Sequence, residues 1–123
     1  MKIAITAQDK NLDADFDPRF GRCKYFVIVD LDTEEHRVEQ NEGTTALGGA
    51  GIKSAQFLAG CEVSAVITGH VGPNASRALE AAGIKVFVMD SGTVRGAITA
   101  YKEGTLTQVS GATTDSHTGL NMS

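Results

Sequence analysis

A short stretch of the sequence, residues 16–30, joins groups that can bind a ligand to a segment that can hold them in place. Cys23 offers a thiolate, which is the soft ligand that iron–sulfur and copper centres prefer. Arg19, Arg22 and Lys24 surround this cysteine in the sequence. Their positive charges are expected to lower the pKa of the thiol and to offset the charge of a bound anionic cluster. These residue types at this spacing therefore predict a site for a metal or an anion.

Each of these side chains also has an ordinary structural explanation. Cys23 can pack as a small hydrophobic residue, and Arg19 and Arg22 can form ion pairs with acidic neighbours. These neighbours are Asp15, Asp17 and Asp30. The loop runs directly into residues 25–29, which are all aromatic or β-branched and therefore typical of a strand buried on both faces. The sequence thus predicts a loop anchored to a core strand and leaves both explanations of its polar residues open.

Two further loops can present backbone amides to an anion. Residues 42–51 are rich in glycine and lead into a predicted helix at 52–59, so amides near Gly49 and Gly51 can hold an anion at the helix start. The second loop follows a predicted strand at 64–69, and its residues of interest are Gly69, His70 and Gly72. The loop at 42–51 matches neither the P-loop pattern nor the dinucleotide-binding pattern.

Composition limits the classes of protein that this chain can represent. The 123 residues are 41% hydrophobic and carry a formal net charge of -4, which predicts a single domain over residues 1–109 followed by a flexible tail, 110–123, that contains His117 and Met122. The sequence has no basic cluster, which argues against a nucleic-acid surface. The first apolar run is too short for a signal peptide or a membrane span, so we expect a cytoplasmic protein with reduced thiols.

The order of predicted elements indicates an α/β fold. An antiparallel pair of strands is followed by alternating helices and strands, an order that predicts parallel strands joined by right-handed crossovers. The predicted strands are residues 2–6, 25–29, 36–41, 64–69 and 84–89, and the predicted helices are 52–59, 75–82 and 93–102. Pro73 suits the first turn of the second helix, and Ser91 can cap the third.

Read together, these segments resemble the dinitrogenase iron-molybdenum cofactor biosynthesis family over about residues 1 to 105. The residues that carry the resemblance are Phe20 to Phe26, the glycine-rich entry to the first helix, Ile67 to Pro73, and Leu79 to Ile84. Members include carriers of iron-sulfur precursors of the nitrogenase cofactor and a protein with a molybdenum-copper-sulfur cluster. The resemblance implies a ribonuclease-H-like three-layer α/β/α fold whose five-stranded sheet has the order 3-2-1-4-5, with strand 2 antiparallel.

That strand order implies a location for the site. Strands 1 and 4 become neighbours whose connections leave toward opposite sides, and open α/β sheets bind ligands in the crevice at such a point. The residues expected to border this crevice are Arg19, Arg22, Cys23, Gly49, Gly51, Gly69, His70 and Gly72. Cys23 and His70 are the candidate metal ligands, although His70 can instead satisfy a backbone carbonyl. Cys61 and His36 are expected at the opposite edge.

The resulting functional hypothesis is a non-enzymatic protein that carries an iron-sulfur or molybdenum-containing cluster, or a precursor, between donor and acceptor proteins. The alternative is an anion- or nucleotide-binding module without a metal. A two-metal nuclease is disfavoured because the predicted strands at 2–6 and 64–69 contain no carboxylate to hold the ions. Nucleophilic catalysis by Cys23 would need a nearby base, for which His70 is the one candidate.

Overall fold

The computed structural model describes residues 1–42 and 49–110, so the loop at 43–48 and the tail with His117 and Met122 lie outside the described residues. The elements are β1 (Lys2–Ala7), a 3-10 helix η1 (Phe20–Arg22), β2 (Tyr25–Asp30), β3 (His36–Gln40), α1 (Ala50–Gly60), β4 (Ala65–Thr68), α2 (Pro73–Ala81), β5 (Lys85–Val88), α3 (Val94–Glu103) and β6 (Thr107–Val109).

The described strands form one mixed sheet in the order β3-β2-β1-β4-β5-β6. β1, β4 and β5 are parallel to one another, and β2 runs antiparallel to both β1 and β3. The predicted order of the first five strands is therefore confirmed. β6 was not predicted, because a strand of three residues gives little sequence signal. It pairs antiparallel with β5, and Val109 packs against the core.

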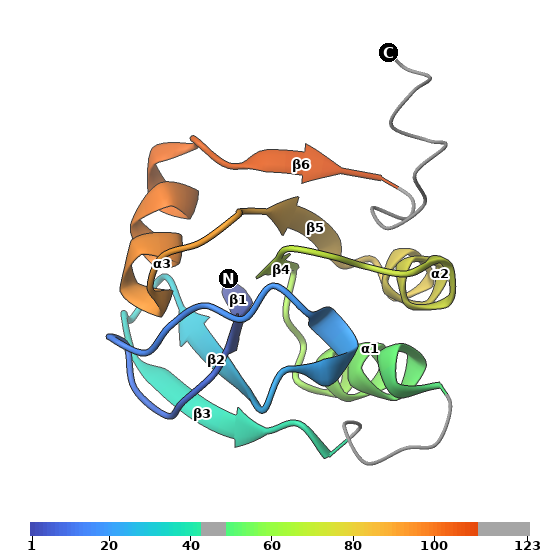
Figure 1. Ribbon diagram of the computed structural model, residues 1–123. Helices are drawn as coiled ribbons and strands as arrows, with labels where there is room; N and C mark the ends of the chain where they lie inside the picture. The colour runs from blue at the N-terminus through green and yellow to red at the C-terminus, as the bar shows by residue number, and fades with distance from the viewer. Residues whose placement is uncertain (43–48, 111–123) are drawn as a thin grey trace.

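Helices cover both faces of this sheet, which makes the predicted three layers (Figure 1). α1 and α2 pack on one face over a core that includes Phe20, Phe26, Leu58 and Leu79. α3 packs on the other face, together with the loop after β1, over a core that includes Ile5, Phe16, Ile67 and Val94. β1 is buried from Ile3 to Ala7 because it lies in the middle of the sheet with side chains on both covered faces.

The starts of the helices differ in detail from the sequence prediction. α1 begins at Ala50, two residues before the predicted start, and Gly49 precedes it with a φ of 72°. Thr93, and not Ser91, caps α3, because the Thr93 hydroxyl oxygen accepts a hydrogen bond from the Gly96 amide at 3.1 Å. α2 begins at Pro73, whose missing N–H costs nothing in the first turn of a helix. Among the described helices, none has the length and apolar character needed to span a bilayer.

Candidate functional site

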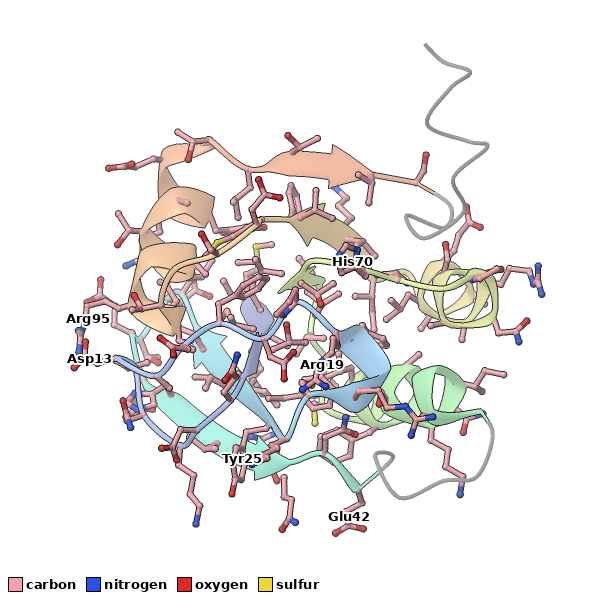
Figure 2. The ribbon with its side chains drawn as sticks, viewed as in Figure 1. Asp13, Arg19, Tyr25, Glu42, His70 and Arg95 are labelled. Carbon is pink, nitrogen blue, oxygen red and sulfur yellow. The ribbon has the colours of Figure 1, made fainter. Side chains whose placement is uncertain are left out.

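The candidate site lies along one edge of the sheet, where several strand ends meet. Ala7 at the end of β1 lies opposite Tyr25 at the start of β2, which in turn lies opposite Gln40 at the end of β3. Thr68 and Val88 end the neighbouring parallel strands β4 and β5 at the same edge. The arrangement confirms that the predicted loops share this edge. Figure 2 shows Arg19 and His70 from two of these loops there.

The loop before η1 crosses this edge and is bonded to the loop after β4. The Pro18 carbonyl oxygen accepts hydrogen bonds from the amides of Gly69, at 3.1 Å, and His70, at 2.6 Å. The Phe20 amide donates to the His70 carbonyl oxygen at 3.3 Å. A Cβ atom at Gly69 would lie 2.6 Å from Pro18 Cβ, so only glycine allows this approach. The Gly69 and His70 amides are therefore already used within the fold, contrary to the expectation that they are free to bind an anion.

Asp17 is a buried carboxylate that holds Arg19 at the surface. The Asp17 side chain is 1% exposed, and its two oxygens accept hydrogen bonds from Arg19 Nε at 3.1 Å and Arg19 Nη2 at 3.0 Å. The Arg19 amide also donates to Asp17 at 3.0 Å. This bidentate hydrogen bonding is the main cause that raises the pKa of Arg19, and the negative charge of Asp17 is the second. Of the two explanations for Arg19, the ion pair with a neighbouring carboxylate is the one that the structure contains.

A buried polar contact beneath this loop was missed by the sequence analysis. Thr6 Oγ1, at the end of β1, hydrogen-bonds to the Asp17 carbonyl oxygen and lies 3.1 Å from Thr68 Oγ1 at the end of β4. Both threonine side chains are fully buried. The two hydroxyls join the central strands to the loop, and the only sequence signal is a polar residue at the end of each apolar strand. Their role is to position the loop.

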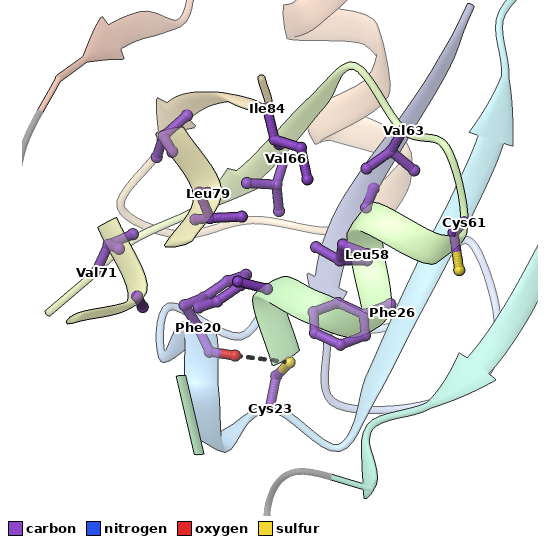
Figure 3. Packing of buried hydrophobic residues seen from close by; sticks show 14 of the residues in the cluster. Phe20, Cys23, Phe26, Leu58, Cys61, Val63, Val66, Val71, Leu79 and Ile84 are labelled. Atoms are coloured by element: carbon purple, nitrogen blue, oxygen red, sulfur yellow. Dashed lines mark hydrogen bonds between the residues drawn. The ribbon is translucent and has the colours of Figure 1, made fainter. Parts of the chain in front are cut away.

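Cys23 lies in the core, and its predicted acidity is wrong. The residue is 0% exposed, its Sγ donates to the Phe20 carbonyl oxygen at 3.3 Å, and Phe26 belongs to the same cluster (Figure 3). Burial raises the pKa of the Cys23 thiol to about 12, and the charge of Asp17 acts in the same direction. The basic neighbours do not reverse this because desolvation dominates and because Arg19 is paired with Asp17. In this conformation Cys23 is a packed thiol and presents no sulfur to solvent.

Asn41 ties the end of β3 to this buried cysteine and to α1. Its Nδ2 donates to the Cys23 carbonyl oxygen at 2.9 Å, and its Oδ1 accepts from Ser54 Oγ at 3.0 Å. Cys61 lies at the far end of α1, and both cysteines are free thiols. His36 lies opposite Val29 near the other end of the strands, as predicted.

A hollow of about 280 Å³ lies where η1 meets the N-termini of α1 and α2. Among the residues that line it are Arg22, Gly49, Gly51 and Gly72, all four from the predicted set. The helices approach closely here, because a Cβ at Gly51 would lie 2.7 Å from Ala75 Cβ and one at Gly21 would lie 2.9 Å from the Gly51 amide nitrogen. Amides in the first turn of a helix lack partners within the helix and carry partial positive charge. The hollow therefore favours a negatively charged ligand.

The structure does not bring all the predicted site residues together in one place. Arg22, Gly49, Gly51 and Gly72 line the hollow, whereas Arg19 and His70 lie beside each other elsewhere on the same edge and are not among its lining residues. His70 is exposed, while Cys23 points into the core. Within residues 1–42 and 49–110, no three His, Cys, Asp or Glu side chains converge to form a metal site.

A family model described as dinitrogenase iron-molybdenum cofactor matches residues 1–104. The chain belongs to this family. All elements that form the hollow fall within the matched range, whereas β6 lies beyond it. The membership relates the chain to proteins associated with the iron-molybdenum cofactor.

Two solved structures and one curated protein are similar to this chain. The apo form of the orange protein from Desulfovibrio gigas is 42% identical, with a TM-score of 0.88 over 90% of this chain and 94% of the other. A putative NifB protein from Thermotoga is 36% identical, with a TM-score of 0.82 over 93% and 97%. An uncharacterized protein from Methanocaldococcus jannaschii is 30% identical over 86% of this chain and 89% of its own.

Proposed function

We propose that this chain is a non-enzymatic carrier that binds an anionic iron-sulfur or molybdenum-containing cluster, or a precursor of one, as cargo. The observation that carries the proposal is the hollow at which two helix N-termini and Arg22 converge, in a chain of the dinitrogenase iron-molybdenum cofactor family. A carrier of this kind would work in the cytoplasm, receiving its cargo from a donor protein and passing it to an acceptor.

The hollow suits cargo that arrives as a preformed anion. Backbone amides of the first turns of α1 and α2, apart from Pro73, which has none, can donate hydrogen bonds to sulfido or oxo groups, and Arg22, which lines the hollow, adds positive charge. Gly49 leaves the backbone open at the start of α1, because a Cβ there would meet no atom of the described residues within 4 Å, while Gly51 lets α1 approach Ala75 of α2 closely. Binding through hydrogen bonds and charge permits release without breaking a metal–thiolate bond, which fits handover to another protein.

The donor set fits hydrogen-bonded binding better than direct ligation. Cys23 is buried, and its raised pKa keeps the sulfur protonated, whereas a metal ligand must be a thiolate. His70 is exposed and could contact a large cluster from the neighbouring loop. Catalysis is disfavoured because β1 and β4 carry no carboxylate that could hold a catalytic metal.

The test is anaerobic reconstitution with iron and sulfide and, separately, with molybdate, copper and sulfide, followed by absorption spectra and metal analysis of the desalted protein. The wild type is expected to retain a coloured cluster, Cys23→Ser to retain it also, and Arg22→Glu to lose most of it. Lys85→Glu, a charge reversal at the start of β5 and the opposite edge of the sheet, is the matched control. A colourless wild type contradicts the proposal, and full retention by Arg22→Glu contradicts the location.

The second candidate is a metal-free module for an anion or nucleotide, which the same hollow would also favour. Thermal unfolding against phosphate and a nucleotide panel distinguishes the two, because a ligand that binds only the folded state raises the melting temperature. A rise with a nucleotide that Arg22→Glu abolishes, in protein that takes up no cluster, would establish this second function instead.

A further inference from the structure

The outer edge of β3 is a strand edge with no partner among the described residues. β3 is the first strand in the sheet order and pairs on its inner side with β2 (Figure 1). All five of its residues are at least partly exposed. An edge strand carries a row of unpaired backbone donors and acceptors and can add another strand. Whether it does so depends on which groups point outward and on which side chains lie beside them.

Hydrogen bonds at the two ends of β3 identify the outward-facing backbone groups. The Asn41 amide donates to the Lys24 carbonyl oxygen, and the Glu35 carbonyl oxygen accepts from the Asp30 amide, each at 2.9 Å. In an antiparallel pair, every second residue of a strand bonds to the neighbouring strand. The odd-numbered residues of β3 therefore direct their N–H and C=O groups toward β2. His36, Val38 and Gln40 therefore direct their N–H and C=O groups outward.

This alternation restricts the ways in which a second copy of β3 can pair. In an antiparallel pair of two β3 strands, the outward-facing residues of one copy bond to the outward-facing residues of the other. Three registers place Val38 of at least one copy within the paired segment: Val38 opposite the partner's Val38, His36 opposite the partner's Val38, and Val38 opposite the partner's Gln40. The second register sets Arg37 against the partner's Arg37, and the third sets Glu39 against the partner's Glu39. The first sets Arg37 against the partner's Glu39, twice by symmetry.

We infer that β3 is a self-association edge, at which two copies of this chain pair their β3 strands antiparallel about a two-fold axis at Val38. Arg37 and Glu39 form an ion pair within one chain, Arg37 Nε to Glu39 Oε2 at 3.2 Å, and on pairing each can reach the partner's opposite charge. These residues occupy non-hydrogen-bonded positions of the new pair, where cross-strand side chains are closest. The charge pattern of the strand is thus complementary to its own two-fold copy.

The dimer is a weak one, because a single strand pair buries less area than a stable interface requires. It is therefore measured at high protein concentration. Sedimentation equilibrium from about 10 µM to about 1 mM is expected to show a monomer–dimer equilibrium, since weak contacts have Kd values in this range. Amide exchange supplies the geometry: Val38 and Gln40 become protected as the concentration rises, whereas the inward Arg37 and Glu39 amides are protected throughout.

Charge reversal tests the register. Arg37→Glu and Glu39→Arg each set like charges against one another twice, so the Kd of either variant alone is expected to rise about tenfold or more. An equimolar mixture of the two variants restores Arg–Glu contacts across the axis and is expected to form a heterodimer. The double variant with both substitutions is expected to dimerise as the wild type does. Glu80→Arg, on the exposed side of α2, is the matched control and leaves the Kd unchanged.

Three results would overturn the inference. One is a wild type that remains monomeric at the highest concentration while the Val38 and Gln40 amides exchange freely. Another is a dimer whose Kd is the same in both single variants as in the wild type. The third is a mixture of the two variants that associates no more tightly than either variant alone. Circular dichroism of each variant shows whether a lost dimer reflects a lost fold.

Discussion

Gly69→Ala tests whether the close approach of two loops organises the site edge. The new Cβ would lie 2.6 Å from Pro18 Cβ and 2.9 Å from both the Pro18 Cα and carbonyl oxygen. These atoms belong to a proline backbone and ring, so they cannot rotate away. Overpacking of this kind costs about 1–3 kcal/mol, and weakening the two hydrogen bonds to the Pro18 carbonyl adds about 1 kcal/mol, which gives a loss of about 2–4 kcal/mol.

The assay is urea unfolding of the purified variant, with thermal unfolding as a second measurement. A loss of about 3 kcal/mol lowers the melting temperature by roughly 10 °C for a chain of this size. Gly60→Ala is the matched control, because a Cβ there meets no atom within 4 Å, and its stability is expected to stay equal or rise by up to about 1 kcal/mol. If Gly69→Ala unfolds within about 0.5 kcal/mol of the wild type, the reasoning from this contact is wrong.

Three further predictions follow from the buried and exposed polar groups. The folded state keeps the Cys23 proton to about pH 12, while the unfolded thiol loses it near its ordinary value of 9.0. The free energy of unfolding should therefore fall with rising pH between these values, by about 1.4 kcal/mol per pH unit. Urea unfolding at a series of pH values measures this fall, and the part due to Cys23 should be absent in Cys23→Ala. Asp17→Asn removes the charge that binds Arg19 and should cost about 1–3 kcal/mol on unfolding, whereas a loss below about 0.5 kcal/mol would show that the ion pair contributes little. Asp13→Ala breaks an exposed ion pair with Arg95 and should leave the unfolding midpoint unchanged; a clear drop would contradict the low value given to surface pairs.

Five strands and their order were predicted before the structure was known. The residues themselves predicted the strands, and the family resemblance predicted their order. Apolar runs such as 25–29 identified strands, because burial on both faces leaves a continuous pattern. The order 3-2-1-4-5 came from the resemblance, since no local pattern states which strands are neighbours. β6 was missed because its three residues are held mainly by pairing with β5.

The convergence of three of the predicted glycines follows from the strand order, whereas the environments of Cys23 and Asp17 do not follow from the sequence. Gly49, Gly51 and Gly72 converge because their helices start at the same edge, which follows from the strand order. The environment of Cys23 does not follow from its neighbours in sequence. Nearby basic residues predicted an acidic thiol, yet packing against Phe20 and Phe26 from separate elements excludes water. Likewise, nothing local indicates that Asp17 is buried and holds Arg19.

The covered position of Cys23 has a consequence for the chemical durability of the chain. Oxidation of cysteine to sulfenic and higher acids proceeds through an exposed thiolate, and this sulfur is both protonated and shielded from solvent. Peroxide generated beside redox-active metals would therefore reach other sulfur atoms first. The sulfur of Met1 is one of these, because Met1 is 48% exposed. Its sulfoxide would form at the surface without disturbing the packed layer beneath α1.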